Sequence, residues 1–437
     1  MTVMPELAKN EGAPNYWRVV IVVMAIYTYA FVDRVILSLL VDPIKADLGA
    51  SDVQMGMMLG LAFAAFYGVF GIPAGHFVDK VNRRRLIGIA SVAWALMTIV
   101  CGMSETLTQL FVGRIGVGVA EAVVTPAAFS LIRDAVPSRS RGLAFSIFAM
   151  SPMIGGAASL IGGSALLKAI EAGALSGVPL LGALEPWQST LVIVGACGLP
   201  FSLALLFISE PARQPQPDAQ NTSMFGNLRE AGAYIFGNAR LYVPLLLYAG
   251  IAAAIPFSNG AWLPTAFGRR WELLPQQVGP VLGLLMLSCG ITGLMFSGMI
   301  MNRIVERGGD IRRFGALCAM FSAVGLAGAI LAPTASLAFA SVGFGTFFLG
   351  NSYSVGATSL ADITPVALMG RVSAVYLLVQ NLFGQALGPL TVALVASYFA
   401  GRNALPYGFA LSMVLFTIAT VASALALGRA IRRNALS

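Results

Sequence analysis

Apolar residues in this chain gather into long runs separated by short polar segments. About twelve of these runs are long enough to cross a bilayer as helices, for which roughly 20 apolar residues suffice. The pattern therefore predicts an all-α polytopic membrane protein with about twelve transmembrane helices. The expected spans are residues 17–41, 53–78, 86–103, 107–132, 142–167, 188–208, 241–266, 275–301, 314–332, 335–361, 371–399 and 407–428.

One long polar connection divides these runs into six plus six. It follows the sixth run and begins EPARQPQPDAQNTS, a composition that suits a linker. We therefore expect an N-terminal six-helix bundle in residues 1–209, a cytoplasmic linker in 210–238 and a C-terminal six-helix bundle in 239–437. Tyr234 and Phe236, near the end of the linker, could belong to a short helix on the membrane surface.

Two short elements recur in both halves. GHFVDK at 75–80 is matched by GMIMNR at 298–303, and DAVPSRSRG at 134–142 is matched by DITPVALMG at 362–370. The displacement along the chain from Gly75 to Gly298 is nearly the same as that from Asp134 to Asp362. Such duplication is a feature of secondary transporters, whose substrate site lies between the repeats.

Composition and charge agree with a membrane protein. The chain has 437 residues, of which 57% are hydrophobic and 11% are charged, whereas soluble domains carry about 25% charged residues. If the N-terminus is cytoplasmic, most of the 27 Lys and Arg fall on the cytoplasmic side, as membrane topology requires. We therefore expect an inner-membrane protein with both termini cytoplasmic and no cleaved signal peptide. The net charge of +8 then reflects topology, and we expect no nucleic-acid partner.

Four ionisable residues lie inside the predicted spans, all in the first half. Asp33 and Arg34 are adjacent in the first run, and Arg114 and Glu121 lie in the fourth. A charged side chain at the centre of a membrane helix costs about 2.5–3.5 kcal/mol on insertion scales, so such residues are usually functional. Arg114 and Glu121 are two helical turns apart, which places them on one face about 10 Å from each other.

Other chemistry finds little support in the sequence. The four cysteines fall in apolar runs without ligand spacing, and His76 is the only histidine, so we expect no metal site. None of the four lysines follows a glycine, so there is no phosphate-binding loop, and we expect no cofactor. An intramembrane enzyme is a remote alternative that lacks a nucleophile–base constellation. The cysteines are Cys101, Cys197, Cys289 and Cys318.

Several motifs resemble those of the major facilitator superfamily over nearly the whole chain. GHFVDKVNRRR at 75–85 is similar to the signature loop after its second helix, with Asn82 where glycine is usual. RIGVGVAEA at 114–122 resembles its fourth-helix signature, whereas ASLIGG at 158–163 lacks the usual Gly-Pro of the fifth. Asp33-Arg34, Glu121-Ala122 and the run SLLVDPIKADLGASDVQMG look most like the bacterial Spinster-type branch.

The resemblance implies that the first and fourth helices both line a central cavity. Asp33 can then approach Arg114, and Arg34 can approach Glu121 or an anionic head group. Burial disfavours a charged carboxylate and a nearby Arg favours it, and alternating access changes both effects. Our hypothesis is that Asp33 and Glu121 are proton-coupling groups with Arg34 and Arg114 as switchable partners, driven by a proton gradient. A static knot of salt bridges is the alternative.

The second half adds no charge at membrane depth, so the cavity would be charged on one wall and apolar on the other. Such a cavity suits an amphiphile, and the resemblance implies a sphingolipid or lysophospholipid carried by a monomer. Proton-coupled transport of small organic anions is the alternative. The polar residues could equally form interhelical hydrogen bonds. The expected substrate-binding residues are Arg34, Glu121, Asn351, Tyr353, Gln380 and Asn381.

The loop after the second helix resembles a conformational latch of the outward-open state. Gly75 would permit close helix approach, and Asp79 could cap a helix or pair with Arg133 or Arg139. Alternatively, the basic cluster at 83–85 merely fixes topology. The expected latch residues are Gly75, Asp79, Lys80, Arg83, Arg84 and Asp134.

Glycines are also frequent in the fifth run. Their spacing favours close helix packing, although it could also let this helix slide. The residues concerned are Gly155, Gly156, Gly162 and Gly163.

Overall fold

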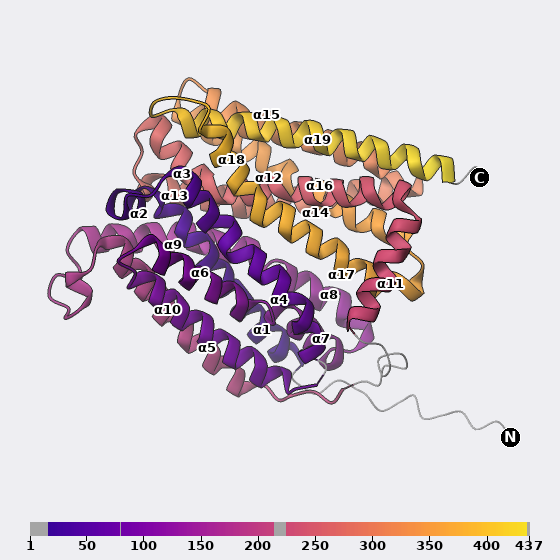
Figure 1. The fold of residues 1–437 in the computed structure, drawn as a ribbon, viewed down its shortest axis with the longest axis horizontal. Helices are drawn as coiled ribbons and strands as arrows, with labels where there is room; N and C mark the ends of the chain where they lie inside the picture. Colours follow the sequence, from indigo (N-terminus) through magenta and orange to yellow (C-terminus); the bar gives the residue numbers. More distant parts are fainter. Residues whose placement is uncertain (1–15, 79, 214–223, 435–437) are drawn as a thin grey trace.

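A computed structural model describes residues 16–78, 80–213 and 224–434 of the chain. These residues form helices and connecting loops, and no β-strand occurs within the described ranges. The first described helix begins, and the last one ends, on the same side of the molecule, which we call the terminus side (Figure 1). The far end is called the opposite side.

The helices gather into two groups that follow the order of the chain (Figure 1). The first half contains α1 (Tyr16–Ile36), α2 (Val41–Leu48), α3 (Asp52–Gly56), α4 (Ala62–Val78), α5 (Arg83–Gly102), α6 (Leu107–Glu121), α7 (Val124–Ala135), α8 (Ser138–Ala149), α9 (Ser151–Glu171) and α10 (Pro186–Leu203). The second half contains α11 (Met224–Gly237), α12 (Ala239–Trp271), α13 (Pro275–Leu285), α14 (Ile291–Glu306), α15 (Ile311–Leu331), α16 (Ala335–Ile363), α17 (Met369–Val379), α18 (Gly388–Ala396) and α19 (Ala404–Asn434).

Short 3-10 and π-helical segments connect or interrupt these helices. Three of them are π-helical and lie within membrane-crossing stretches: η2 (Met57–Leu61), η5 (Met286–Gly290) and η7 (Gln380–Leu387). The 3-10 segments are η1 (Leu37–Leu39), η3 (Leu181–Ala183), η4 (Ala204–Phe207) and η6 (Val366–Leu368).

Eleven continuous helical stretches of the described chain are long and apolar enough to cross a membrane. A further helix, α16, has 29 residues and occupies the remaining expected range, so at the usual helical rise it is about 43 Å long. The predicted all-α architecture with twelve transmembrane helices is therefore confirmed. The short helix expected around Tyr234 is present as α11.

A proline explains the break in the fourth span. Pro126 has no N–H to donate to the carbonyl of Ala122, and its ring clashes with a helical carbonyl at that position. Accordingly, α6 ends at Glu121 and α7 begins at Val124. The break leaves Glu121 at the last turn of α6, deep inside the first half, where it is 1% exposed.

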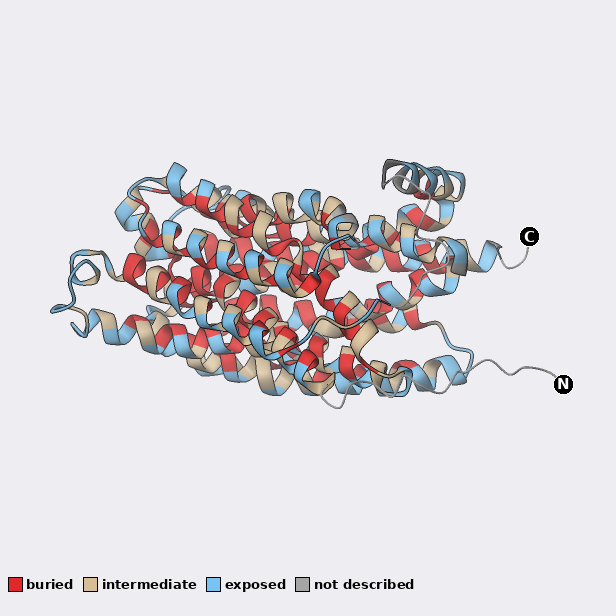
Figure 2. Ribbon diagram, turned by 90° about the horizontal axis from the view of Figure 1, so that it is seen from below, coloured by how far each residue is buried: buried red, intermediate tan, exposed pale blue. Residues whose placement is uncertain are grey.

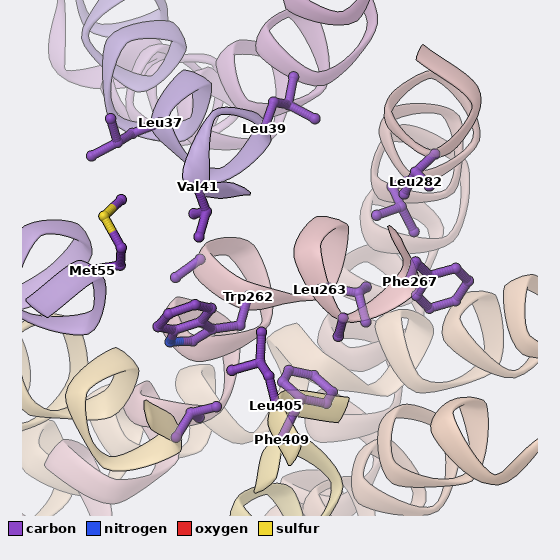
Figure 3. Packing of buried hydrophobic residues seen from close by; sticks show 14 of the residues in the cluster. Leu37, Leu39, Val41, Met55, Trp262, Leu263, Phe267, Leu282, Leu405 and Phe409 are labelled. Carbon is purple, nitrogen blue, oxygen red and sulfur yellow. The ribbon is translucent and has the colours of Figure 1, made fainter. Parts of the chain in front are cut away.

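The two halves pack tightly against each other on the opposite side. One continuous hydrophobic cluster there combines Leu37, Val41 and Met55 of the first half with Trp262 and Leu405 of the second (Figure 3). Buried residues continue through the interior of the molecule, while exposed apolar residues cover much of its flanks (Figure 2). Apolar flanks are expected where lipid replaces water as the solvent.

Two pairs of glycines bring the backbones of the two halves into close contact. Gly56 and Gly60 of the second span lie against carbonyls of α18 and η7, and Gly279 and Gly283 of α13 lie against carbonyls of α9. A Cβ atom at any of the four would lie within 3.2 Å of a carbonyl oxygen of the other half. The displacement along the chain from Gly56 to Gly279 equals the one that relates the two GHFVDK-like motifs.

The motif glycines on the terminus side make no comparable contact. A Cβ atom built on Gly75, Gly142, Gly298 or Gly370 would have no atom within 4 Å. The close helix approach expected at Gly75 is therefore absent in this conformation. The halves are thus packed closely at the paired glycines of the opposite side and not at the motif glycines of the terminus side.

The glycines of α9 differ among themselves. Gly155 packs on Phe31, and Gly156 packs on Met286, in each case with 2.7 Å between a built Cβ and a side-chain atom. Gly163 faces Leu39 at 3.3 Å. Gly162, however, has no atom within 4 Å of a built Cβ, because it faces outward. The prediction of close packing is therefore wrong at Gly162.

Candidate functional site

Four charged residues of α1 and α6 form two ion pairs, and we call them the charged quartet. Three of them are buried, and 9% of the Arg34 side chain is accessible. Arg34 Nη2 lies 2.6 Å from Glu121 Oε2, and Arg114 Nη1 lies 3.4 Å from Asp33 Oδ2. The exposed fractions are 2% for Asp33, 4% for Arg114 and 1% for Glu121. These are the two pairings that the sequence analysis named. Their role in proton coupling stays a prediction.

The two carboxylates of the quartet differ in how many of their oxygens have hydrogen-bond partners. Thr98 Oγ1 of α5 donates a hydrogen bond of 2.5 Å to Asp33 Oδ1, so both oxygens of Asp33 have partners. Glu121 Oε2 accepts from Arg34, whereas Glu121 Oε1 has no hydrogen-bond partner among the described residues. A buried oxygen without a partner is rare and calls for an explanation such as a proton, a water molecule or a ligand group.

Three aromatic rings surround the Arg34 guanidinium. Its Cζ lies 4.7 Å from the ring centroid of Phe31, 4.5 Å from that of Phe63 and 4.8 Å from that of Tyr67. The ring centroid of Phe63 also lies 5.5 Å from the Cζ of Arg114, so the same ring contacts both guanidinium groups. Cation–π contacts of this kind contribute about 0.5–2 kcal/mol. The sequence analysis missed these residues, although Phe63 and Tyr67 are spaced for one helix face.

The quartet carries no net charge when all four groups are ionised. A proton on either carboxylate would leave one guanidinium without a counter-ion inside a buried site, where an uncompensated charge is costly. An anionic group could then replace the lost carboxylate charge. The arrangement can therefore exchange a proton for an anion. In the described part of the chain, no cluster of His, Cys, Asp or Glu suits a metal ion.

The polar residues of the second half lie apart from this network. Asn351 of α16 is fully buried, Gln380 is 3% exposed, and Asn381 Nδ2 donates to Leu377 O at 2.9 Å. The side chain of Tyr353 lies outside the described ones. No hydrogen bond described here joins these residues to the quartet, so their role in substrate binding stays a prediction.

Gln380 and Asn381 belong to the π-helical segment η7. Leu382 and Ala386 of this segment pack in the same hydrophobic cluster as Phe63 of α4. π-helical turns are frequent at functional sites, because they change the direction of side chains within a helix. The sequence analysis did not predict this segment, since a π-turn leaves no simple periodic signal.

The predicted latch forms a buried ion cluster within the first half. Arg83 pairs with Asp134 and, at 2.7 Å, with Glu210, and it donates to Ser130 Oγ at 2.9 Å and to Pro211 O at 2.8 Å. Arg83 and Asp134 are both fully buried. Glu210 was missed, because its position at the start of the linker gave no sign of a partner.

The other expected latch residues add few contacts to this ion cluster. Arg84 Nη1 donates to Ile208 O at 2.8 Å, and Lys80 is exposed. Asp79 lies outside the described residues. Among the residues that are described, no ion pair joins this cluster to the second half. A latch function for it stays a prediction.

A second charged cluster joins the two halves on the opposite side, and we call it the opposite-side clamp. Arg269 at the end of α12 lies 2.7 Å from Asp42 and 2.7 Å from Asp52, and Lys45 also pairs with Asp52. The clamp consists of Asp42, Lys45, Asp52 and Arg269. No motif pointed to it, because its residues come from two distant parts of the chain.

Comparisons with known proteins agree on one family. The model of the Major Facilitator Superfamily matches residues 23–389. An MFS-type efflux pump of Mycolicibacterium smegmatis is 27% identical over 404 residues, covering 89% of this chain and 86% of the relative. A probable L-galactonate transporter of Escherichia coli is 22% identical over 415 residues, covering 91% and 85%.

Solved structures share the fold. A bacterial homologue of the human lysosomal transporter Spinster, in an inward-facing and unoccupied conformation, superimposes with a TM-score of 0.80 at 24% identity, covering 96% of this chain and 98% of that one. A D-xylose–proton symporter gives a TM-score of 0.69 at 15% identity, covering 94% and 96%. Both are transporters rather than enzymes. Because the family match spans most of its length, this chain belongs to the major facilitator superfamily and is a secondary transporter.

Proposed function

We propose that this transporter couples proton movement to the transport of an amphiphilic lipid of the sphingolipid or lysophospholipid type. The observation that carries the proposal is the charged quartet inside the first half, in which one oxygen of Glu121 has no hydrogen-bond partner among the described residues. In the second half, no charged residue lies in the middle of a predicted membrane span. A polar head at the quartet and a tail along apolar helices would match this asymmetry.

The proposed coupling step exchanges the partner of Arg34. Protonation of Glu121 removes its charge, which frees the Arg34 guanidinium for an anionic head group such as a phosphate. Loss of the proton re-forms the 2.6 Å ion pair and displaces the head group. Asp33 acts as a second proton-accepting group that is held by Arg114 and Thr98. Because each state keeps the buried cation neutralised, neither requires an uncompensated charge.

The setting of the protein is part of the same proposal. Lys and Arg gather on the terminus side, which by the positive-inside rule is the cytoplasmic side of the cell (inner) membrane. A single chain holds both repeats and the quartet, so a monomer is sufficient for transport.

Proton-coupled transport of small organic anions is the second candidate. Two observations favour it: a relative is named as a probable L-galactonate transporter, and two guanidinium groups flank Phe63. An anion without a tail would need only this cationic part of the site. The two candidates differ in one requirement: a lipid needs an apolar surface beside the cationic site for its tail, and a small anion does not. Direct transport measurements distinguish them.

The test is flux into proteoliposomes with and without an imposed pH gradient. Asp33→Asn and Glu121→Gln remove the proposed proton acceptors while keeping side-chain size, and we expect each to lower gradient-driven flux at least tenfold. Glu105→Gln, which changes an exposed carboxylate on the opposite side, is the matched control. Undiminished coupling in both quartet variants would rule out the proton assignment.

The same vesicles identify the substrate class. Labelled lysophospholipid and a labelled sugar acid are offered in separate arms at equal concentration. Uptake of the lysophospholipid supports the lipid proposal. Uptake of the sugar acid alone would rule out the lipid and support transport of small organic anions. Neither outcome depends on the coupling ion, so substrate and coupling are tested independently.

A further inference from the structure

An apolar groove lies on the flank of the first half, and its lining includes none of the four residues of the charged quartet. Its volume is about 480 Å³, and its lining is almost entirely hydrophobic. The groove belongs to three helices, α1, α9 and α10, all of which are membrane spans. Residues that line it include Ile21, Val32 and Ile36 of α1, Gly162 and Leu166 of α9, and Val194 of α10.

The groove exists because small residues of α9 leave space beside α1. Gly162 has no atom within 4 Å of a built Cβ, so the space at this position is unfilled by protein. The walls around it are fixed: Ser159 Oγ donates to Val32 O at 2.9 Å, which holds α9 on α1. Tyr29 stacks on Phe201 at 4.6 Å between ring centroids, which holds α10 on α1. The hollow is therefore built into the packing of three helices.

The length and position of the groove fit an acyl chain. From Ile21 to Ile36 the helix rises about 22 Å, which is most of the roughly 30 Å hydrocarbon thickness of a bilayer. Ile21 is 61% exposed, and Gly162 is also exposed, so the groove opens on the flank that faces lipid. An apolar groove at this depth is filled by hydrocarbon, since water has no polar partner there.

A cationic residue, Arg18, precedes the groove along α1. Arg18 is exposed and lies one turn before Ile21, so the two side chains share a face of α1. Among the described residues, Arg18 forms no ion pair. It lies in the first turns of α1, on the terminus side, where a membrane span meets the head groups of the bilayer. Basic residues at this level attract anionic lipids about fivefold per residue.

We propose that this groove, which we call the α1–α9–α10 groove, binds one acyl chain of an anionic phospholipid whose phosphate pairs with Arg18. The lipid comes from the leaflet on the terminus side, because Arg18 is at that end. The inference requires only that the chain spans a membrane and does not depend on the transported substrate. Tyr29, a wall of the groove, lies one turn before Asp33 on α1, so an occupied groove would stiffen the helix that carries the quartet.

A native cysteine makes the proposal measurable. Cys197 is exposed and lies on α10 between the groove residues Val194 and Phe201, whereas Cys101 and Cys318 are buried. With Cys289 replaced by Ser, a bimane label on Cys197 reports contact with lipid in nanodiscs. Quenching is compared between phosphatidylglycerol and phosphatidylcholine that carry bromine on the same acyl carbon, each at the same mole fraction.

We expect phosphatidylglycerol to quench at least twofold more effectively than phosphatidylcholine. Arg18→Gln should abolish this preference, whereas Lys168→Gln, at the other end of α9, should leave it unchanged. Gly162→Leu fills the groove without meeting any atom near its Cβ, so it should fold normally, as gel filtration checks, and reduce quenching by both lipids.

Three results would overturn the proposal. Equal quenching by the two lipids would mean that no anionic lipid is selected. A loss of preference in Lys168→Gln but not in Arg18→Gln would place the head group in the other leaflet. Unchanged quenching in a folded Gly162→Leu variant would show that no chain enters the groove.

Discussion

The two ends of the contact between the halves are built differently. On the opposite side, the clamp crosses between the halves, and four glycines press against carbonyls of the partner half. On the terminus side, Arg83 is equally rich in ion pairs, but its described partners belong to its own half or to the start of the linker. The glycines of the repeated loops there have open space around them.

This difference indicates which ion pairs can separate during a transport cycle. The clamp residues are partly exposed. With 49% of its side chain accessible, Asp42 forms a weak pair with Arg269, whereas the Arg269–Asp52 pair is less exposed and has two hydrogen bonds. Such pairs can separate when the halves rock apart. The Arg83–Asp134 pair is fully buried and would be expensive to break. We therefore interpret the terminus-side cluster as a fixed part of one rigid body and the clamp as the element that opens.

The largest expected effect comes from breaking the buried cluster. Arg83→Gln removes the buried counter-ion of Asp134 and Glu210 and leaves Asp134 only the partly exposed Arg133, 3.0 Å away, so we expect the free energy of unfolding to fall by about 3 kcal/mol. The loss is measured as a lower thermal midpoint in detergent. Arg85→Gln is the control, because the Arg85 side chain is exposed. If Arg83→Gln were stable but changed the balance between open and closed states, the cluster would be a latch after all.

The next effect concerns the glycine contacts. In Gly60→Ala the new Cβ would lie 2.8 Å from Gln385 O, and such overpacking costs about 1–3 kcal/mol. We expect the closed state on the opposite side to lose that much stability. The measurement is labelling by an impermeant maleimide of a Val41→Cys probe, in a background without the exposed cysteines. Gly75→Ala, which meets no atom within 4 Å, should label at the parental rate.

A smaller effect is expected for the clamp itself. Arg269→Gln removes the ion pairs to Asp42 and Asp52 that join the halves. Because exposed pairs contribute about 0.2–1 kcal/mol each, labelling of the same probe should become about fivefold faster. High salt should reduce the difference between parent and variant, since it screens exposed charges. Identical labelling rates at low salt would argue against a clamp.

The smallest effect should come from the second-half counterpart of Arg83. Arg312 lies 3.0 Å from Asp362, and Asp362 follows Asp134 at the repeat displacement. The Asp362 side chain is 50% exposed, so Arg312→Gln should cost less than about 1 kcal/mol. Thermal unfolding of both variants compares the repeats directly. Equal losses would mean that burial does not set the strength of these pairs.

Much of the architecture was predictable, because the bilayer imposes a simple rule on sequence. A span must be apolar for about 20 residues, so the twelve runs can be read from hydrophobicity alone, whereas several helices extend a few residues beyond the predicted ends. The same rule made Asp33, Arg34, Arg114 and Glu121 conspicuous, because charges are rare at that depth. The break after Glu121 also had a visible signal in Pro126.

Contacts between residues far apart in the chain could not be predicted from a single sequence. The clamp brings Arg269 to Asp42 and Asp52 from the other half of the chain, and the Phe63 ring reaches two cations through helix packing. Gly155 and Gly162 look alike in sequence, yet one presses on α1 and the other faces open space. Which face of a membrane helix meets protein and which meets lipid depends on its neighbours, because both surroundings are apolar.

The sequence by itself therefore determined the number of spans, the duplicated plan and the four charges that must find partners inside the membrane. Each follows from the free energy of placing a side chain in hydrocarbon, which is a property of the residue alone. Only the tertiary structure decided which aromatic rings surround Arg34, which end of the molecule is closed and where a groove remains. These depend on the relative positions of helices far apart in the chain, and no local physical rule fixes them.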